Sequence, residues 1–426
     1  MRRLPLLLLF AATPAIAEPL TLQGAIDLAL GKNPEVAVAK ETVAGNAAKT
    51  SSTKAKRWAA LGLNAAFNYW REPYALDFGG QSFTLHEQRT STTVVTLTQP
   101  LTGLGYLTQL IDAAEHETAA SQHEYDRVRL DIAYRTAEAY IHVLQARASA
   151  DVAHRSVDDI ASELTRAQQL RQADTYTDID VLRFRSAKAS ADQTALKADT
   201  AIQTGLATLT LQLGLPDGAA VDIADTLPAS PPALVMTVEQ AQQKAIAARP
   251  ELAAARERIA AADNMRKGAY RGYIPDIRAV AAWQHFTGVQ PFQPENEEYV
   301  GLQANWTIWD WGATHESIIE AEHTKARAVI GAGALADQVK LDVRKRWLEA
   351  KTQFDSLAVA QSQQQTAEEA FRLQKVKFEA AAATATDVLD AETDVARARL
   401  GFAVARYDYY LALVGLARAM GDLPKP

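Results

Sequence analysis

The sequence of 426 residues contains no cysteine, and no apolar run in it approaches the roughly 18 uninterrupted residues that a membrane-spanning helix needs. The first absence excludes a disulfide framework and thiolate metal sites, and it leaves no cysteine to carry a lipid. The second excludes a transmembrane helix. Phosphate-binding loops, serine-nucleophile elbows and zinc-protease motifs are missing as well, so we expect no enzyme activity and no cofactor.

Basic residues are in the minority, 44 against 51 acidic ones, and two of them lie in a short N-terminal segment. Arg2 and Arg3 precede the apolar run Leu4 to Phe10, and the small residues Ala15-Ile16-Ala17 follow. This pattern predicts a secretory signal peptide over residues 1–17. Its removal takes away two arginines and no acid, which lowers the net charge from −7 to −9. An exported chain of this acidity is not expected to bind nucleic acid.

Helix-breaking residues are absent from two long stretches. Neither glycine nor proline occurs between Tyr106 and Thr204, and no proline occurs between Glu295 and Leu423. Alanine, leucine, glutamine, arginine and glutamate dominate both stretches, and these residues lose little entropy in a helix. We expect two long helices in each stretch, joined by tight turns near 173–177 and 380–384. The first helix would run for roughly 100 Å at 1.5 Å per residue.

The chain repeats itself. Residues 100–214 align without a gap on residues 307–421 at a shift of 207, which pairs Gly105 with Gly312 and Asp180 with Asp387. A unit this long indicates a duplicated domain half rather than a solenoid repeat. The predicted segments are the signal peptide at 1–17, a first repeat at 18–214, a linker at 215–236, a second repeat at 237–421 and a tail at 422–426.

Each repeat is expected to contain two β-strands followed by a long helical hairpin. Apolar and polar residues alternate in the fourth strand, where Val300 and Leu302 are separated by Gly301 and followed by Gln303. Such alternation is typical of a strand with one apolar face. The expected strands lie at about 60–71, 89–101, 274–286 and 299–309, and the hairpins at 105–214 and 312–421.

The strands favour a membrane location. Each is about ten residues long, which suits a tilted strand crossing a bilayer. Six of the seven tryptophans lie in or beside these strands, and aromatic residues typically mark the membrane interfaces. Soluble hairpins packed on helices are the alternative. Four strands cannot close a barrel, so a membrane location requires several copies. The expected membrane-interface aromatics are Trp70, Trp283, Trp306, Trp309 and Trp311.

These features together resemble the TolC family of outer-membrane efflux ducts. The resemblance is carried by the export signal, the two copies of strand, strand and helical hairpin, the helix-opening Asn33-Pro34-Glu35, and the tip sequence from Thr384 to Ala391. It implies a homotrimer with a 12-stranded transmembrane β-barrel, continued by a periplasmic α-helical barrel. It also implies a passive channel in the outer membrane of a Gram-negative bacterium, which exports small molecules or ions. The implied partners are outer-membrane lipid, a periplasmic adaptor (membrane fusion protein) and an inner-membrane transporter, proton-driven or ATP-driven, that selects the cargo.

The resemblance places a periplasmic gate at Asp387 and Asp390, which lie three residues apart and therefore on one helix face. Helix capping is the alternative explanation for Asp387, because Asp180 stands at the equivalent turn. It does not explain Asp390, whose equivalent is Arg183. Phe378 and Ala383 replace the hydroxyl-bearing and basic latch residues of some members. The expected adaptor-contact tips are Thr175, Tyr176, Thr177, Ala382, Thr384 and Thr386.

Two other functions fit parts of the sequence. A trimeric coiled-coil adhesin also combines helices with four strands per chain, but it places those strands together at the C-terminus. A soluble periplasmic helical scaffold would use the hairpins alone. Metal export raises the question of a metal site, yet His116 and His323 belong to no recognisable ligand pattern and are expected on helix surfaces.

Overall fold

The computed structural model describes residues 19–173, 176–225, 227–228, 230–289, 293–380 and 382–423. The predicted signal peptide lies outside these residues, as does Thr175. The chain forms two compact units, and each is described by itself. None of the helices in the described ranges is long and apolar enough to span a membrane.

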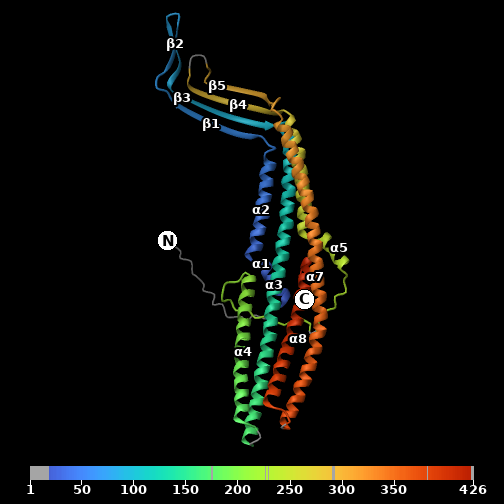
Figure 1. The fold of residues 1–426 in the computed structure, drawn as a ribbon. Helices are drawn as coiled ribbons and strands as arrows, with labels where there is room; N and C mark the ends of the chain where they lie inside the picture. Colours follow the sequence, from blue (N-terminus) through green and yellow to red (C-terminus); the bar gives the residue numbers. More distant parts are fainter. Residues whose placement is uncertain are drawn as a thin grey trace, which may run out of the picture. The chain divides into compact units, whose positions relative to one another are not determined.

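The first unit consists of Met1–Ala39, Tyr125–Pro250 and Ala336–Pro426 and is helical. Its helices are α1 (Leu22–Lys32), α4 (Asp178–Gln212), α5 (Val238–Ala248), α8 (Ala385–Ala419) and the longer parts of α3 (Gly103–Gln172) and α7 (Ala313–Glu379) (Figure 1). Two of these helices are 70 and 67 residues long. Their length follows from the absence of proline and from alanine-rich faces that pack closely.

Capping boxes fix where three of these helices begin. Thr177 opens α4, Thr237 opens α5 and Thr384 opens α8, and each side chain accepts a bond from the backbone three residues later. The side chain of that later residue in turn accepts a hydrogen bond from the backbone N–H of the threonine. Two otherwise unpaired N–H groups are thereby satisfied at each helix start, so the turns of both hairpins end at defined residues.

The two repeats also share the contact between their short first helix and the end of their hairpin. The Asn33 amide donates to the carbonyl O of Gln212 at 2.9 Å, and its own oxygen caps the helix that follows. Arg249 stands in the equivalent place, where its Nη1 donates to the carbonyl O of Ala419 at 3.1 Å and pairs with Asp342. The duplicated contact therefore survives a change from amide to guanidinium, although arginine offers no acceptor to cap a helix.

Tyrosine hydroxyls hold the connecting segment between the repeats against the helices. Tyr140 is fully buried and donates to the carbonyl O of Leu20 at 2.9 Å and to that of Ala224. Tyr409 and Tyr410 of α8 donate to the carbonyls of Pro232 and Pro228, at 2.7 and 2.6 Å. Proline-rich backbone lacks N–H groups for a ladder, so side-chain donors from the helices satisfy its carbonyls instead.

The second unit consists of Lys40–Glu124 and Glu251–Leu335 and contains the sheet. Its elements are most of α2 (Pro34–Ala55), β1 (Ala60–Tyr69), β2 (Tyr74–Phe78), β3 (Gln81–Pro100), most of α6 (Pro250–Ala269), the 3-10 helix η1 (Tyr270–Tyr273), β4 (Asp276–Val289), β5 (Asn296–Asn305) and the first parts of α3 and α7. The strand order is β1-β3-β4-β5, all antiparallel, with β2 beside β3 (Figure 1). The predicted mainly helical class is confirmed, and the four long strands form one antiparallel sheet.

One strand was not expected. The segment Tyr74–Phe78 lies between the two strands expected in the first repeat, and it pairs with the start of β3. Gly79 and Gly80 form the turn, with φ of 60° and 85°. Glycine accepts such angles without strain, so the loop closes into a hairpin extension of the main sheet.

Candidate functional site

The sheet has one apolar and one polar face. The register places Leu61 opposite Leu97, Leu97 opposite Ala281, and Ala281 opposite Val300, so one apolar row crosses all four long strands. Paired residues of neighbouring strands lie on the same face. The apolar alternation predicted in β5 therefore belongs to a face shared by the whole sheet.

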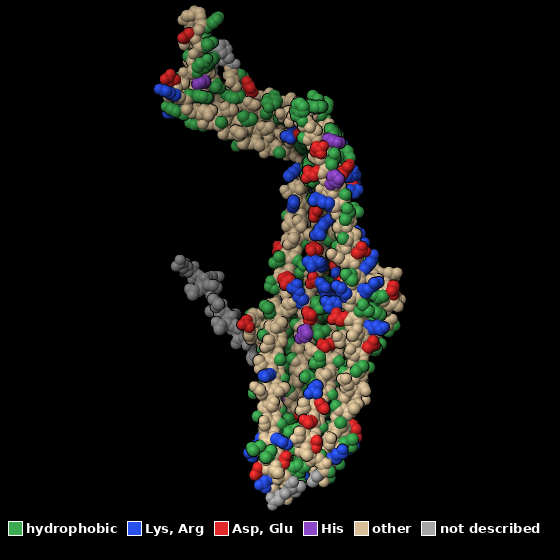
Figure 2. Space-filling view, viewed as in Figure 1, with side chains coloured by type: hydrophobic (Ala, Val, Ile, Leu, Met, Phe, Trp, Pro, Cys, Tyr) green, Lys and Arg blue, Asp and Glu red, His purple; other side chains and the backbone are tan. Residues whose placement is uncertain are grey.

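The apolar face is open to its surroundings. Val300 is 86% exposed and Leu61 74% exposed. Figure 2 shows hydrophobic side chains over the sheet, with charged ones gathered towards its two ends. The opposite face carries rows such as Asn64, Val94 and Gln284. A continuous exposed apolar face needs a nonaqueous environment or a partner, because water makes its exposure unfavourable.

Both margins of the sheet are unpaired. Within the described part of the chain, β1 pairs only with β3, and β5 only with β4. All ten residues of β1 are exposed. Each margin therefore presents a row of free backbone donors and acceptors, which is a template for strand pairing with another chain.

The predicted interface aromatics do not all lie in strands. Trp283 lies on the apolar face of β4, opposite Val95. β5 ends at Asn305, so Trp306, Trp309 and Trp311 lie in the connection to α7, and their side chains are 55%, 72% and 89% exposed.

Trp70 is held more firmly than the other predicted interface aromatics. It donates from Nε1 to the Thr90 hydroxyl at 3.0 Å, and its ring packs on that of His86.

The tips of the two hairpins contact one another within the first unit. The Tyr176 hydroxyl donates to the carbonyl O of Ala383 at 2.7 Å, and its ring centre lies 4.8 Å from that of buried Phe378. Arg183 donates from Nη1 to the Thr386 hydroxyl at 2.8 Å. Tyr176 and Ala383 are equivalent positions of the repeat, so this bond joins the same position of the two hairpins.

The two predicted gate residues have different surroundings. Asp387 belongs to the capping box of α8: the backbone N–H and the hydroxyl of Thr384 both donate to its Oδ2 at 2.8 Å. These bonds stabilise the ionised form, so the pKa of Asp387 lies below its ordinary value. Asp390 is exposed, and no ion pair or hydrogen bond engages it among the described residues. Capping thus accounts for Asp387 and leaves Asp390 without a structural role.

The predicted adaptor-contact residues also include some with structural contacts and one that is simply exposed. Tyr176 and Thr386 are engaged in the contact between the tips, and Thr177 and Thr384 cap helices. Ala382 is exposed.

Charged side chains beyond those predicted link the hairpins above the tips. Arg399 of α8 pairs with Asp159 of α3 at 3.0 Å and with Glu368 of α7 at 3.1 Å. Buried Glu392 accepts a hydrogen bond from the Ser156 hydroxyl at 2.5 Å. Burial raises the pKa of Glu392, and the bond from Ser156 offsets part of that rise. Removing one member of such a network would leave a charge desolvated, so it holds α3 against α7 and α8.

The histidines form no metal centre within the residues that the structure describes. His116 lies with Nδ1 2.7 Å from Glu257 Oε2, so it pairs with a single carboxylate on α6.

Both repeats of the chain match a known protein family. Residues 25–215 and 241–422 match the family model described as Outer membrane efflux protein. Among curated proteins, the outer membrane efflux protein BepC of Brucella suis biovar 1 (strain 1330) is 22% identical over 317 residues, which cover 74% of this chain and 68% of BepC.

Solved structures share the same fold. A membrane protein from Pseudomonas aeruginosa is similar with a TM-score of 0.81 and 20% identity, over 94% of this chain and 93% of that one. The outer membrane protein VceC from Vibrio cholerae is similar with a TM-score of 0.78 and 18% identity, over 94% and 96% of the two chains.

Proposed function

We propose, because this chain belongs to the outer membrane efflux protein family, that three copies of it assemble into one export duct. Membership confirms the predicted resemblance: the chain is an outer-membrane efflux channel of the TolC family with a periplasmic helical extension, and it is not an enzyme. It also decides against the adhesin and the soluble scaffold. The trimer, the adaptor and the energised inner-membrane transporter belong to the proposal.

The main support for a trimer is an exposed apolar sheet face that ends in two unpaired edge strands. An unpaired backbone group costs several kcal/mol in hydrocarbon, and about eight strands are the fewest that close a barrel. Three copies bring twelve long strands, with β1 of one copy beside β5 of the next. The apolar face then contacts lipid and the polar face lines the duct.

We expect the protein extracted from membranes in mild detergent to have the mass of three chains. Native mass spectrometry measures this directly, and bilayer recordings of the same sample should show steady ion currents. Because the margins are sealed only by other copies, a monomer that keeps its β-signal in circular dichroism would contradict the trimer.

The tips of the hairpins form the proposed periplasmic gate. Three copies would bring six carboxylates from Asp387 and Asp390 around one constriction, which attracts cations and repels anions. Ala382 is the clearest candidate for an adaptor contact, because it is exposed and none of the described contacts between the tips involves it. Thr175, Tyr176, Thr177, Thr384 and Thr386 complete the proposed contact surface. The cargo is selected by the transporter, since a passive duct supplies no energy.

The gate assignment predicts a loss of cation preference when Asp390 is changed. Asp390→Asn removes three carboxylates from the trimer, and we expect a lower ratio of cation to anion permeability in bilayer recordings under a salt gradient. Asp387→Asn with Asp390→Asn should lower it further and raise the conductance. Asp180→Asn is the matched control, because Asp180 caps the equivalent helix of the first hairpin. Equal selectivity in Asp390→Asn and the unmodified protein would remove Asp390 from the gate.

A further inference from the structure

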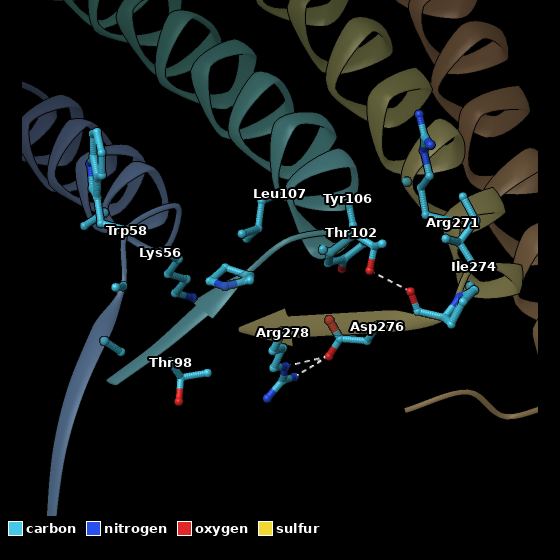
Figure 3. A pocket seen from close by; sticks show the side chains of 18 of the residues that line it. Lys56, Trp58, Thr98, Thr102, Tyr106, Leu107, Arg271, Ile274, Asp276 and Arg278 are labelled. Atoms are coloured by element: carbon cyan, nitrogen blue, oxygen red, sulfur yellow. Dashed lines mark hydrogen bonds and ion pairs between the residues drawn. The ribbon is translucent and has the colours of Figure 1, made fainter. Parts of the chain in front are cut away.

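A cavity of about 880 Å³ lies in the second unit, where three segments of the chain pass between helix and strand (Figure 3). Its walls come from the end of α2 and start of β1, from the end of β3 and start of α3, and from the end of α6 and start of β4. No residue of the predicted site lines it. The cavity is therefore distinct from the proposed gate.

The cavity opens on the polar face of the sheet. Its floor includes Thr98 and Arg278, and the register places Arg278 opposite Gln303, whereas neighbouring Ala279 lies opposite Leu302 on the apolar face. Because successive residues alternate between faces, lipid contacting the apolar face cannot reach the floor. Under the proposed function, on which this inference rests, the cavity faces the inside of the duct.

The lining has an excess of positive charge. It contains Lys56, Arg271 and Arg278 but a single acid, Asp276, which is paired with Arg278 at 2.5 Å. Among the described residues, no carboxylate lies within ion-pair distance of Lys56 or Arg271. Two cations in the wall are thus left without a counter-charge.

The start of α3 adds to this positive field. The first turn of α3 contains no acid, and the Arg271 guanidinium carbon lies 3.4 Å from where a Cβ on Gly105 would stand. A helix N-terminus carries a partial positive charge, which Asp276 offsets where its Oδ1 lies 3.3 Å from the place of a Cβ on Gly103, whereas Arg271 adds to it beside Gly105.

Apolar side chains form the remaining walls. Trp58 and Tyr106 line the cavity, and they are 77% and 45% exposed. Leu107 of α3 and Ile274, which lies beside Arg271, add further apolar surface to the lining (Figure 3). A small inorganic anion would leave these walls in water, whereas a ring system would cover them.

We propose that this cavity binds organic anions with an apolar ring system, carboxylates or sulfonates, as they pass along the duct. The acid would pair with Arg271 beside the start of α3, and the ring would lie against the neighbouring Tyr106, whereas Lys56 and Trp58 stand on the opposite side of the cavity (Figure 3). The duct would then combine acidic tips with a basic site at the level where helices give way to strands. Cargo with both an anionic and an apolar part would be retained there before release.

Equilibrium dialysis of the detergent-solubilised full chain tests the proposal, with naphthalene-2-sulfonate as the probe and empty micelles as the blank. We expect saturable binding of the sulfonate that exceeds binding of 2-naphthylmethylammonium. Arg271→Gln should weaken it about tenfold or more, as expected for losing a hydrogen bond to a charged group. Arg57→Gln is the matched control: it removes the same charge from the end of α2, but Arg57 does not line the cavity.

The remaining outcomes would overturn the proposal. Absence of saturable binding would mean that the cavity is filled in the assembled protein. Equal binding of the cationic probe would mean that both probes only partition into an apolar region. Equal weakening by Arg57→Gln and Arg271→Gln would mean that only the net charge of the protein matters. A conducting trimer without sulfonate binding rejects this site alone, whereas a monomer without currents rejects the duct.

Discussion

Leu302→Lys will leave little assembled protein in the outer membrane. Leu302 lies opposite Ala279 on the apolar face and is 72% exposed, so in the proposed trimer its side chain would contact lipid. A lysine on the lipid face of a barrel costs about 2–4 kcal/mol near the membrane midplane and less near the interfaces. The cost recurs in each copy. We expect a large fall in the yield of folded trimer, measured by fractionation of membranes and by urea titration in lipid vesicles.

Gln303→Lys is the control for this substitution. Gln303 is the next residue of β5 and lies opposite Arg278 on the polar face, where water solvates a new ammonium group. We expect nearly unchanged yield and stability apart from a small cost of placing a lysine opposite Arg278, whose charge is paired with Asp276. Comparable losses at both positions would mean that the two faces do not differ in their surroundings, and the membrane orientation of the sheet would have to be abandoned.

The two faces of the sheet could be predicted because they are determined by the sequence within each strand. Alternation along one strand determines which residues share a face, and the register only had to bring equivalent rows together, as it does for Leu97 and Ala281. β2 was missed because a five-residue strand before Gly79-Gly80 has too few residues to show a period. The tryptophan-rich segment after Asn305 was assigned to the fourth strand for the opposite reason: aromatic residues favour strands, but pairing with β4 stops at Asn305.

At the helix tips, the capping boxes could be predicted from the sequence but the contacts between the two hairpins could not. Capping boxes at Thr177 and Thr384 involve residues three apart, so a threonine followed by an aspartate indicates them. The bond from Tyr176 to Ala383 joins residues 207 positions apart, and it depends on how closely two separate hairpins approach. The repeat aligned these residues without indicating contact between them. Likewise, Arg249 stands at the position equivalent to Asn33, but its bond to the Ala419 carbonyl depends on the folded helix end.

Gly214→Ala will strongly destabilise the helical unit. Gly214 ends α4 with φ of 70°, and a Cβ there would lie 2.6 Å from the carbonyl O of Lys32, at the break between α1 and α2. The left-handed backbone costs an alanine about 1–2 kcal/mol, and the overlap with rigid backbone adds about 1–3 kcal/mol. We expect a loss of about 3 kcal/mol or more in the free energy of unfolding, measured by circular dichroism during urea titration in detergent.

Substitutions at two other glycines serve as controls for this prediction. Gly421 is the repeat equivalent, with φ of 84°, but a Cβ there would lie 3.0 Å from the carbonyl carbon of Ala248. The wider gap predicts a smaller loss for Gly421→Ala. Gly401 lies within α8, and a Cβ there would meet nothing within 4 Å. Gly401→Ala should therefore stabilise the protein by up to about 1 kcal/mol, since alanine favours the helix. The order Gly214, Gly421, Gly401 follows from backbone geometry alone, and a stable Gly214→Ala protein would contradict the close approach between the end of α4 and the break that follows α1.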